Sequence, residues 1–205
     1  MTIRFHRHDL PDLSNYDVGA IAIDTETLGL NPHRDRLCVV QISPGDGTAD
    51  VIQIARGQKK APNLVALLRN RKITKIFHFG RFDLAVLFNA FGVMPEPVFC
   101  TKIASRLTRT YTDRHGLKDI CSELIGVNLS KVQQSSDWAA DELTPEQLEY
   151  AASDVLHLHA LMDVLKGRLE REGRTKEAEA CFRFLPTRAR LDLMGWDEDD
   201  IFAHS

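Results

Sequence analysis

Four acidic residues in apolar surroundings constrain the fold of this 205-residue chain more than any other feature. Asp24 and Glu26 stand at the polar end of the apolar run 19–23, and Asp83 and Asp154 are each followed directly by apolar residues. A carboxylate is expensive to bury alone. A fold that gathers several of them is reasonable if divalent cations neutralise the charge, and oxygen ligands suit Mg²⁺ or Mn²⁺. The pattern therefore points to metal-assisted phosphodiester chemistry.

Size and charge limit the other possibilities. A chain of this length with 43% hydrophobic residues can bury one substantial core, so we expect one domain. The formal net charge of −3 argues against a protein that coats long nucleic acid through bulk electrostatics. A local basic cluster of Arg106, Arg109, Arg114 and Lys118 remains available for phosphate groups.

The cysteines and the N-terminal segment indicate the compartment. The four cysteines are widely spaced and include no C-x-x-C pair, which argues against a zinc site or a disulfide framework and fits a reducing environment. The first residues lack the apolar core of a signal peptide, and no apolar run approaches the ~20 residues of a membrane span. We expect a soluble cytoplasmic protein.

The apolar periodicity predicts a mixed α/β domain. Strands are expected at 19–24, 37–43, 49–54 and 75–78, the first three as an antiparallel meander, with helices at 62–70 and 81–91 and mainly helices after 101. Thr144, Pro145 and Gln147 form a helix-start signal, and the helix that follows is expected to run to about Arg171 and to end at Gly173.

These elements can bring the acidic residues together. Asp24 and Glu26 are two positions apart, so on a strand both side chains point to the same face. Tyr150 and Asp154 are four apart and share one face of the predicted helix. Asp83 begins a helix after a strand. Two divalent cations held there would clamp the attacking and leaving oxygens of an in-line displacement, and a tyrosine beside them could orient the attacking water.

Each acidic residue also has a simpler interpretation when it is considered alone. A D-x-E sequence at a strand end is usually a solvated loop edge, and Asp83 is favoured at a helix N-terminus by the helix dipole. Asp154 could be solvated beside the apolar stripe, with Tyr150 at the edge of the core. Order, spacing and local sequence taken together favour the catalytic interpretation.

Together the motifs resemble the DEDD superfamily of 3′→5′ exonucleases. The matching residues are Asp24-x-Glu26 followed by Thr27, Gly29 and Leu30, then Phe82-Asp83-Leu84, then Tyr150-x₃-Asp154. The histidine of the h-type branch would fall at Glu149, so the chain resembles the y-type branch and RNase D. The resemblance implies an RNase H-like fold, with a mixed five-stranded sheet flanked by helices and two divalent cations, Mg²⁺ or Mn²⁺.

The segment 111–118 and the tail 195–204 narrow the resemblance to the short nano-RNase C family of alphaproteobacteria. This implies a dinuclease that acts on short RNA, chiefly dinucleotides, and a homo-oligomer in the form of an octameric ring. We expect a single exonuclease domain over residues 1–205, without the helical nucleic-acid-binding (HRDC) domains of RNase D and with the region from about 172 to 205 in oligomer contacts. A subunit contact through Trp196, Ile201 and Phe202 is one alternative, and a disordered acidic tail is the other.

The resemblance also suggests substrate contacts. Leu30 would wedge between the two bases at the 3′ end, with Leu28 as the next candidate and a core leucine as the alternative. Thr27 could contact the terminal 3′-hydroxyl. His78 and Phe82 flank Asp83, and Phe82 would either stack on a base or pack in the core.

A dinuclease has to reject longer chains, and a cap on a terminal 5′-phosphate would do so. Arg114, His115 and Lys118 are candidates because guanidinium and ammonium groups bind phosphate well. A solvated basic turn is the alternative for each. Lys131 and Gln134 could approach the phosphates too.

Three other functions compete with the dinuclease hypothesis. The nearest is a general RNase D-like exonuclease that trims longer RNA or DNA ends with the same catalytic residues. A catalytically inactive nucleic-acid-binding scaffold is disfavoured by the intact acidic set. An aspartyl-phosphate phosphatase would need a second Asp where Glu26 stands.

Overall fold

A six-stranded mixed sheet forms the centre of the computed structural model, which describes residues 2–130, 133 and 136–204. The strand order is β1-β4-β3-β2-β5-β6. The strands are β1 (Thr2–Arg7), β2 (Ala20–Thr27), β3 (Leu37–Ser43), β4 (Thr48–Gln53), β5 (Thr74–Phe77) and β6 (Val98–Cys100). β2, β3 and β4 form the predicted antiparallel meander, whereas β1, β5 and β6 each run parallel to the neighbour nearer the centre.

The predicted α/β, RNase H-like class is confirmed, but the sheet has six strands rather than five. β1 and β6, the two edge strands, were not identified from the sequence. In β1 charged Arg4 and His6 interrupt the apolar residues, and their role appears only across the sheet. There the buried carboxylate of Asp50 on β4 accepts hydrogen bonds from Arg4 at 2.7 and 2.8 Å and from the Tyr16 hydroxyl at 2.5 Å, and His6 lies 2.6 Å from it. β6 has only three residues, too few for a periodic signal.

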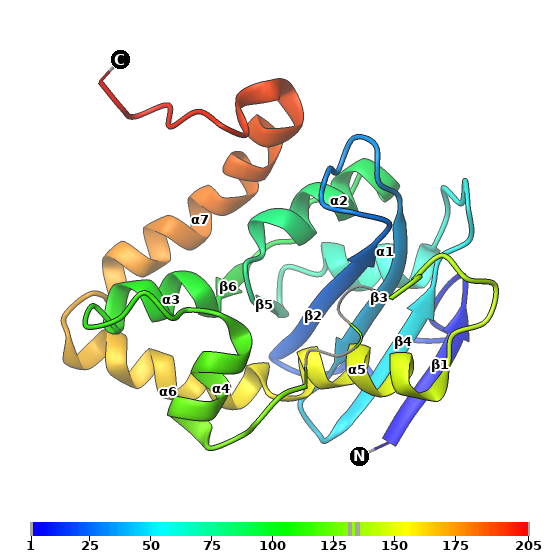
Figure 1. Ribbon diagram of the computed structural model, residues 1–205, viewed down its shortest axis with the longest axis horizontal. Helices are drawn as coiled ribbons and strands as arrows, with labels where there is room; N and C mark the ends of the chain where they lie inside the picture. The colour runs from blue at the N-terminus through cyan, green and yellow to red at the C-terminus, as the bar shows by residue number, and fades with distance from the viewer. Residues whose placement is uncertain (1, 131–132, 134–135, 205) are drawn as a thin grey trace.

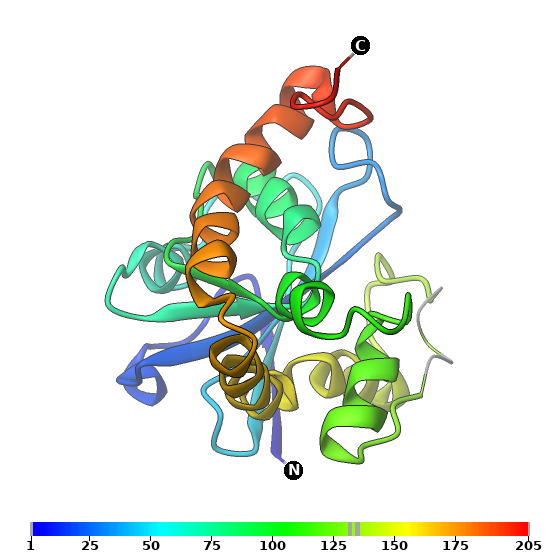
Figure 2. The ribbon, with the colours of Figure 1, turned by 90° about the vertical axis from the view of Figure 1, so that its left-hand side faces the viewer.

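Helices cover both faces of this sheet. They are α1 (Pro62–Arg69), α2 (Arg81–Phe91), α3 (Thr101–Thr108), α4 (Leu117–Ile125), α5 (Pro145–Leu156), α6 (Leu158–Arg171) and α7 (Thr175–Leu191). α5 crosses one face over β2, β3, β4 and β1, and α1 and α2 lie behind the sheet in the same view (Figure 1). The perpendicular view places the sheet between α5 and α6 on one side and α2 and α7 on the other (Figure 2). None of the helices in the described ranges is long and apolar enough to cross a membrane.

The predicted long helix after Thr144 is divided in two. Its start is as predicted: the Thr144 side chain accepts from the Gln147 backbone, and the Gln147 side chain accepts from the Thr144 backbone. At His157, however, the backbone leaves regular helical geometry (φ −104°, ψ −6°), so α5 and α6 are separate helices. The apolar stripe continues across this break and does not reveal it. α6 ends at Arg171, and Gly173 adopts a left-handed conformation with φ of 64°.

The tight turn between β5 and α2 positions the second acidic motif. Phe79 has a positive φ of 63°, which is uncommon for a residue with a side chain. A Cβ atom on Gly80 would lie only 2.7 Å from the Cβ of Phe77, so the turn needs glycine there. α2 begins at Arg81, and Asp83 therefore lies in its first turn.

Candidate active site

Three acidic side chains from two elements meet above the centre of the sheet. Asp24 and Glu26 project from β2, and Asp154 projects from α5, which packs on that strand. One carboxylate oxygen of each residue lies within 4.8 Å of the other two. The strand period of two and the helical spacing of four thus give the convergence expected from the sequence.

Asp83 completes the acidic cluster from α2. Its side chain is buried, and its Oδ1 accepts a hydrogen bond of 2.7 Å from the Thr25 hydroxyl. Its negative charge contributes to raising the pKa of both Asp24 and Glu26. The structure therefore brings together all four acidic residues that the sequence singled out.

Two polar residues that the sequence analysis did not select hold this cluster in place. Gln41 lies directly opposite Asp24 in the β2–β3 register and donates a hydrogen bond of 2.8 Å to Asp24 Oδ2. Its Oε1 is buried without a partner among the described residues. Thr25 holds Asp83 in the same way. A glutamine within the apolar run 37–43 was the sequence signal that Gln41 has a buried polar partner. Only the strand register identifies that partner as Asp24.

Tyr150 lies one helical turn before Asp154 on α5, so the two side chains share one face of the helix. Its ring packs 6.0 Å, centroid to centroid, from the buried Trp138. Burial, followed by the charges of Asp154 and Glu26, raises the pKa of the Tyr150 phenol well above its usual range. Tyr150 is therefore a neutral hydroxyl beside the carboxylates at any working pH.

The cluster has no cationic partner among the described side chains, and its carboxyl groups resist ionisation. Burial, supplemented by mutual repulsion, raises the pKa of Glu26 to about 9 and that of Asp24 well above its ordinary value. Burial likewise raises the pKa of Asp83 and of Asp154 to about 7. The side chains that hydrogen-bond to the cluster are neutral, and no described Arg or Lys forms an ion pair with it.

An all-oxygen set of four carboxylates fits hard divalent cations such as Mg²⁺ or Mn²⁺. A cation bound there would favour the ionised carboxylates against the burial and mutual repulsion that raise their pKa values, so both the charge and the donor chemistry of the site suit it. Each of the four residues offers a carboxylate oxygen as a metal ligand, so the residues present fit a divalent cation.

The loop between β2 and β3 presents the predicted leucines to solvent. Leu30 is 86% exposed and Leu28 is 54% exposed, so the alternative of a core leucine is wrong for Leu30. The Thr27 hydroxyl donates to the Gly29 carbonyl within this loop. Their contacts with substrate stay predictions.

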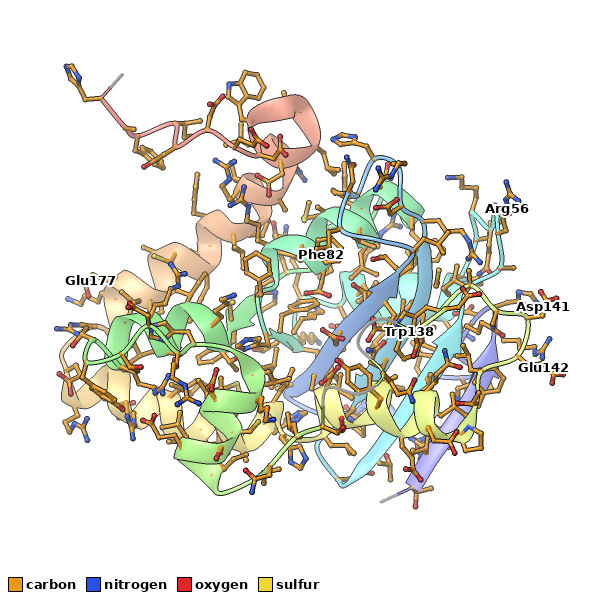
Figure 3. All side chains as sticks on the ribbon, in the orientation of Figure 1. Arg56, Phe82, Trp138, Asp141, Glu142 and Glu177 are labelled. Atoms are coloured by element: carbon orange, nitrogen blue, oxygen red, sulfur yellow. The ribbon has the colours of Figure 1, made fainter. Side chains whose placement is uncertain are left out.

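Phe82 and His78 occupy two different settings around Asp83. Phe82, labelled in Figure 3, is partly buried against the core. It lines a cavity of about 410 Å³ together with Leu30 and Arg81. The Nδ1 of His78 lies 2.9 Å from the Thr101 hydroxyl, and burial lowers the pKa of the imidazole to about 3. His78 is thus a neutral ring that is tied to α3.

The predicted phosphate-binding residues do not form one open cluster. Arg114 is exposed but forms an ion pair of 2.6 Å with Asp119, and His115 Nδ1 lies 2.9 Å from the Ser105 hydroxyl. Lys118 is exposed and forms no hydrogen bond or ion pair with a described residue. Lys131 and Gln134 lie outside the described residues.

Arg109, which the sequence placed in a basic cluster, is buried. It is 1% exposed, forms an ion pair with Glu123 and donates to the Arg114 carbonyl and the Ser105 hydroxyl. Its charge supports the turn that carries Arg114 and is not available to a ligand. The interpretation of Arg109 as part of a free basic surface was therefore wrong.

The comparison with known proteins identifies the family of this chain. A family model described as 3′-5′ exonuclease matches residues 10–170. The chain belongs to the 3′–5′ exonuclease family. Ribonuclease D of Gluconacetobacter diazotrophicus is 36% identical over 154 residues, which are 75% of this chain and 39% of that protein. The chain thus spans about two fifths of the length of this curated relative.

Solved structures of NrnC from Brucella melitensis match this exonuclease over the whole length of both chains. The structure described as bound to pGG has 80% sequence identity and a TM-score of 0.98. The structure described as having bound Mg²⁺ has 78% identity and a TM-score of 0.97. Together with the RNase D homologues, these relatives place the chain in the RNase D-like, nano-RNase C branch of the exonuclease family.

Proposed function

We propose that this exonuclease hydrolyses short oligoribonucleotides, chiefly dinucleotides, from the 3′ end and releases nucleoside 5′-monophosphates. The observation that carries the proposal is the partly buried cluster of Asp24, Glu26, Asp83 and Asp154 beside the neutral hydroxyl of Tyr150. The similarity to NrnC, of which one structure is bound to pGG, supports a short RNA substrate.

The four carboxylates would hold two divalent cations, Mg²⁺ or Mn²⁺. Bound there, the cations would supply charge neutralisation for the phosphate and activation for the attacking water. The use of a divalent metal is supported by the NrnC structure with bound Mg²⁺, and the number of cations and the use of Mn²⁺ are proposed from the size of the carboxylate set. Gln41 and Thr25 would fix the orientation of Asp24 and Asp83 for this role.

Tyr150 and Glu26 would position the attacking water by hydrogen bonds. The water oxygen forms the new bond to phosphorus, and the bond from phosphorus to the 3′-oxygen of the preceding nucleotide breaks. The 3′-terminal nucleotide then leaves with a 5′-phosphate, and the preceding nucleotide keeps a 3′-hydroxyl that has gained a proton. Because the phenol of Tyr150 stays neutral, it can both donate and accept in this step.

The substrate contacts are proposed from exposure and position. Leu30 would separate the two bases, helped by Leu28, since both extend into solvent from the loop after β2. Thr27 would lie near the 3′-hydroxyl, and Phe82 and His78 would border the preceding base.

A 5′-phosphate would be capped by Arg114, His115 and Lys118. Arg114 would have to exchange Asp119 for the phosphate, whereas Lys118 forms no ion pair with a described residue. This cap would distinguish dinucleotides from longer chains.

The region from about 172 to 205 would serve contacts between copies of the chain, as in the proposed octameric ring. Met194, Trp196, Ile201 and Phe202 are exposed apolar residues there, and the ring of Phe202 lies 5.7 Å from that of Phe184 on α7. A second copy would cover this apolar surface. A cytoplasmic location and action on DNA ends stay predictions.

The decisive experiment is a metal-dependent cleavage time course on 5′-labelled RNAs of two to seven nucleotides at equal concentration. A strong preference for the dinucleotide is expected. Equal cleavage at all lengths would favour the general RNase D-like trimming function and remove the proposed cap. No cleavage at any length with Mg²⁺ or Mn²⁺ would refute the exonuclease proposal.

A further inference from the structure

A second cavity, separate from the carboxylate cluster, is strongly cationic. It has a volume of about 900 Å³ and lies where β1 and β4 end, next to the loop after β2 and residues 139–141. Its cationic lining consists of Arg7, Arg34, Arg36, Arg56 and Lys59, and Asp141 is the acidic residue among the described lining. We call this cavity the basic pocket. Arg56 and Asp141 mark the edge of the molecule on which it lies (Figure 3).

Most of this positive charge is not neutralised within the described part of the chain. Arg34 forms an ion pair of 2.7 Å with Asp35. Arg7 reaches only the backbone carbonyl of Asp141, at 3.5 Å. The side chains of Arg56 and Lys59 are exposed and form no hydrogen bond or ion pair with a described residue. The basic pocket therefore attracts anions.

Arg36 gives the basic pocket a fixed guanidinium. Its Nη1 donates to the carbonyls of Leu37 at 3.2 Å and of Ile54 at 2.9 Å. Carbonyl partners hold the side chain in place and leave its charge uncompensated. Among the described residues its Nε and Nη2 groups have no acceptor, so this edge of the planar guanidinium can donate two parallel hydrogen bonds to the oxygens of a phosphate group.

The loop that carries Arg56 and Lys59 is also held in place. The Nε2 of Gln58 donates to the carbonyls of His8 at 2.6 Å and of Lys60 at 2.9 Å. Its Oε1 accepts from the backbone of Ala55 at 3.1 Å. These bonds fix the loop against the end of β1, which reduces the ordering cost of binding a ligand.

We propose that the basic pocket binds the phosphate group of a nucleoside 5′-monophosphate. Its volume lies in the range of small-ligand sites, and its cations match a phosphate dianion. Leu28 forms part of its wall and follows the strand that carries Asp24 and Glu26, so the basic pocket adjoins the proposed site of cleavage. The choice of this ligand rests on the proposed function, in which such a nucleotide is the product.

The test is a calorimetric titration of the full-length protein with 5′-AMP in EDTA, where the carboxylate cluster holds no cation. The double variant Arg56→Glu/Lys59→Glu reverses two charges of the basic pocket. Lys60→Glu is the matched control, because Lys60 is exposed in the same loop but does not line the pocket. Adenosine, which lacks the phosphate, and heptaadenylate, which carries internal phosphates, are the comparison ligands.

The expected result is that the double variant binds 5′-AMP at least about 10-fold more weakly, that Lys60→Glu binds it as the wild type does, and that adenosine does not bind. Equal affinity in the double variant and the wild type would overturn the proposal. So would an equal loss in Lys60→Glu, or binding of heptaadenylate without binding of 5′-AMP. Turnover is not measured, so a failure here leaves the cleavage experiment, and the function it tests, unaffected.

Discussion

Removing one charge from the carboxylate cluster is expected to stabilise the metal-free protein while it abolishes activity. The pKa of Asp154 is raised to about 7 in the folded state, above its ordinary value of 3.8. Between these two values the folded protein binds more protons than the unfolded chain, so the stability contributed by this group falls as the pH rises. The amide of Asn in Asp154→Asn cannot ionise, so the variant does not lose this stability as the pH rises. The variant should therefore exceed the wild type in stability at pH 8 and approach it at pH 5.

The structure also sets the size of this effect. A difference of one pKa unit between the folded and unfolded states corresponds to about 1.4 kcal/mol of free energy. The rise of the Asp154 pKa from 3.8 to about 7 can therefore lower the free energy of unfolding by at most roughly 4 kcal/mol. Asp154 is only partly buried, so solvent reaches the site in part and reduces the cost of its charge. We therefore expect Asp154→Asn to be more stable than the wild type by about 1–2 kcal/mol at pH 8. For a domain of this size that is a rise in Tm of roughly 2–8 °C.

The assay is thermal unfolding of the wild type and of Asp154→Asn in EDTA at pH 5, 6, 7 and 8, repeated with Mg²⁺. Asp163→Asn is the matched control, because Asp163 is an exposed aspartate on the next helix. Mg²⁺ should raise the Tm of the wild type more than that of the variant, since a ligand stabilises only the state that binds it. A lower Tm for Asp154→Asn than for the wild type at pH 8 in EDTA would refute this reasoning.

Three further substitutions test the surroundings of the cluster. Tyr150→Phe should lower kcat about 10- to 100-fold and keep the Mg²⁺-induced rise in Tm, because in the proposed mechanism the hydroxyl orients water while the acids hold the metal. An unchanged kcat at saturating Mg²⁺ would contradict this role. Gln41→Leu removes the donor to Asp24 and should raise the Mg²⁺ concentration for half-maximal activity about 10-fold, which a metal titration of activity would measure. Arg81→Met breaks the ion pair of 2.5 Å with the buried Asp192 and should lower the free energy of unfolding, measured in urea, by about 1–3 kcal/mol. The loss should be smaller than for a buried charge left without any partner, because Arg188 also pairs with Asp192.

The sequence predicted the acidic cluster because its signals are local. Asp24 and Glu26 share a strand face, and Tyr150 and Asp154 share a helix face, whatever the rest of the chain does. The helix start at Thr144 depends equally on residues within one turn, and the structure shows both of its hydrogen bonds.

Other features could not be read from the sequence because their partners are distant along the chain. Arg109 looked like part of a basic surface until the fold buried it beside Glu123. The sequence analysis identified no strand at β1, where Arg4 and His6 meet the buried Asp50 across a parallel pairing.

The sequence by itself predicted which residues would carry the chemistry, and it determined on which face of each element they lie, since the periods of strands and helices are properties of the local backbone. Only the tertiary structure decided that Gln41 faces Asp24, that the helix breaks at His157, and that cations from three segments line the basic pocket. Strand register and the burial of charges depend on long-range packing, and no local pattern encodes them.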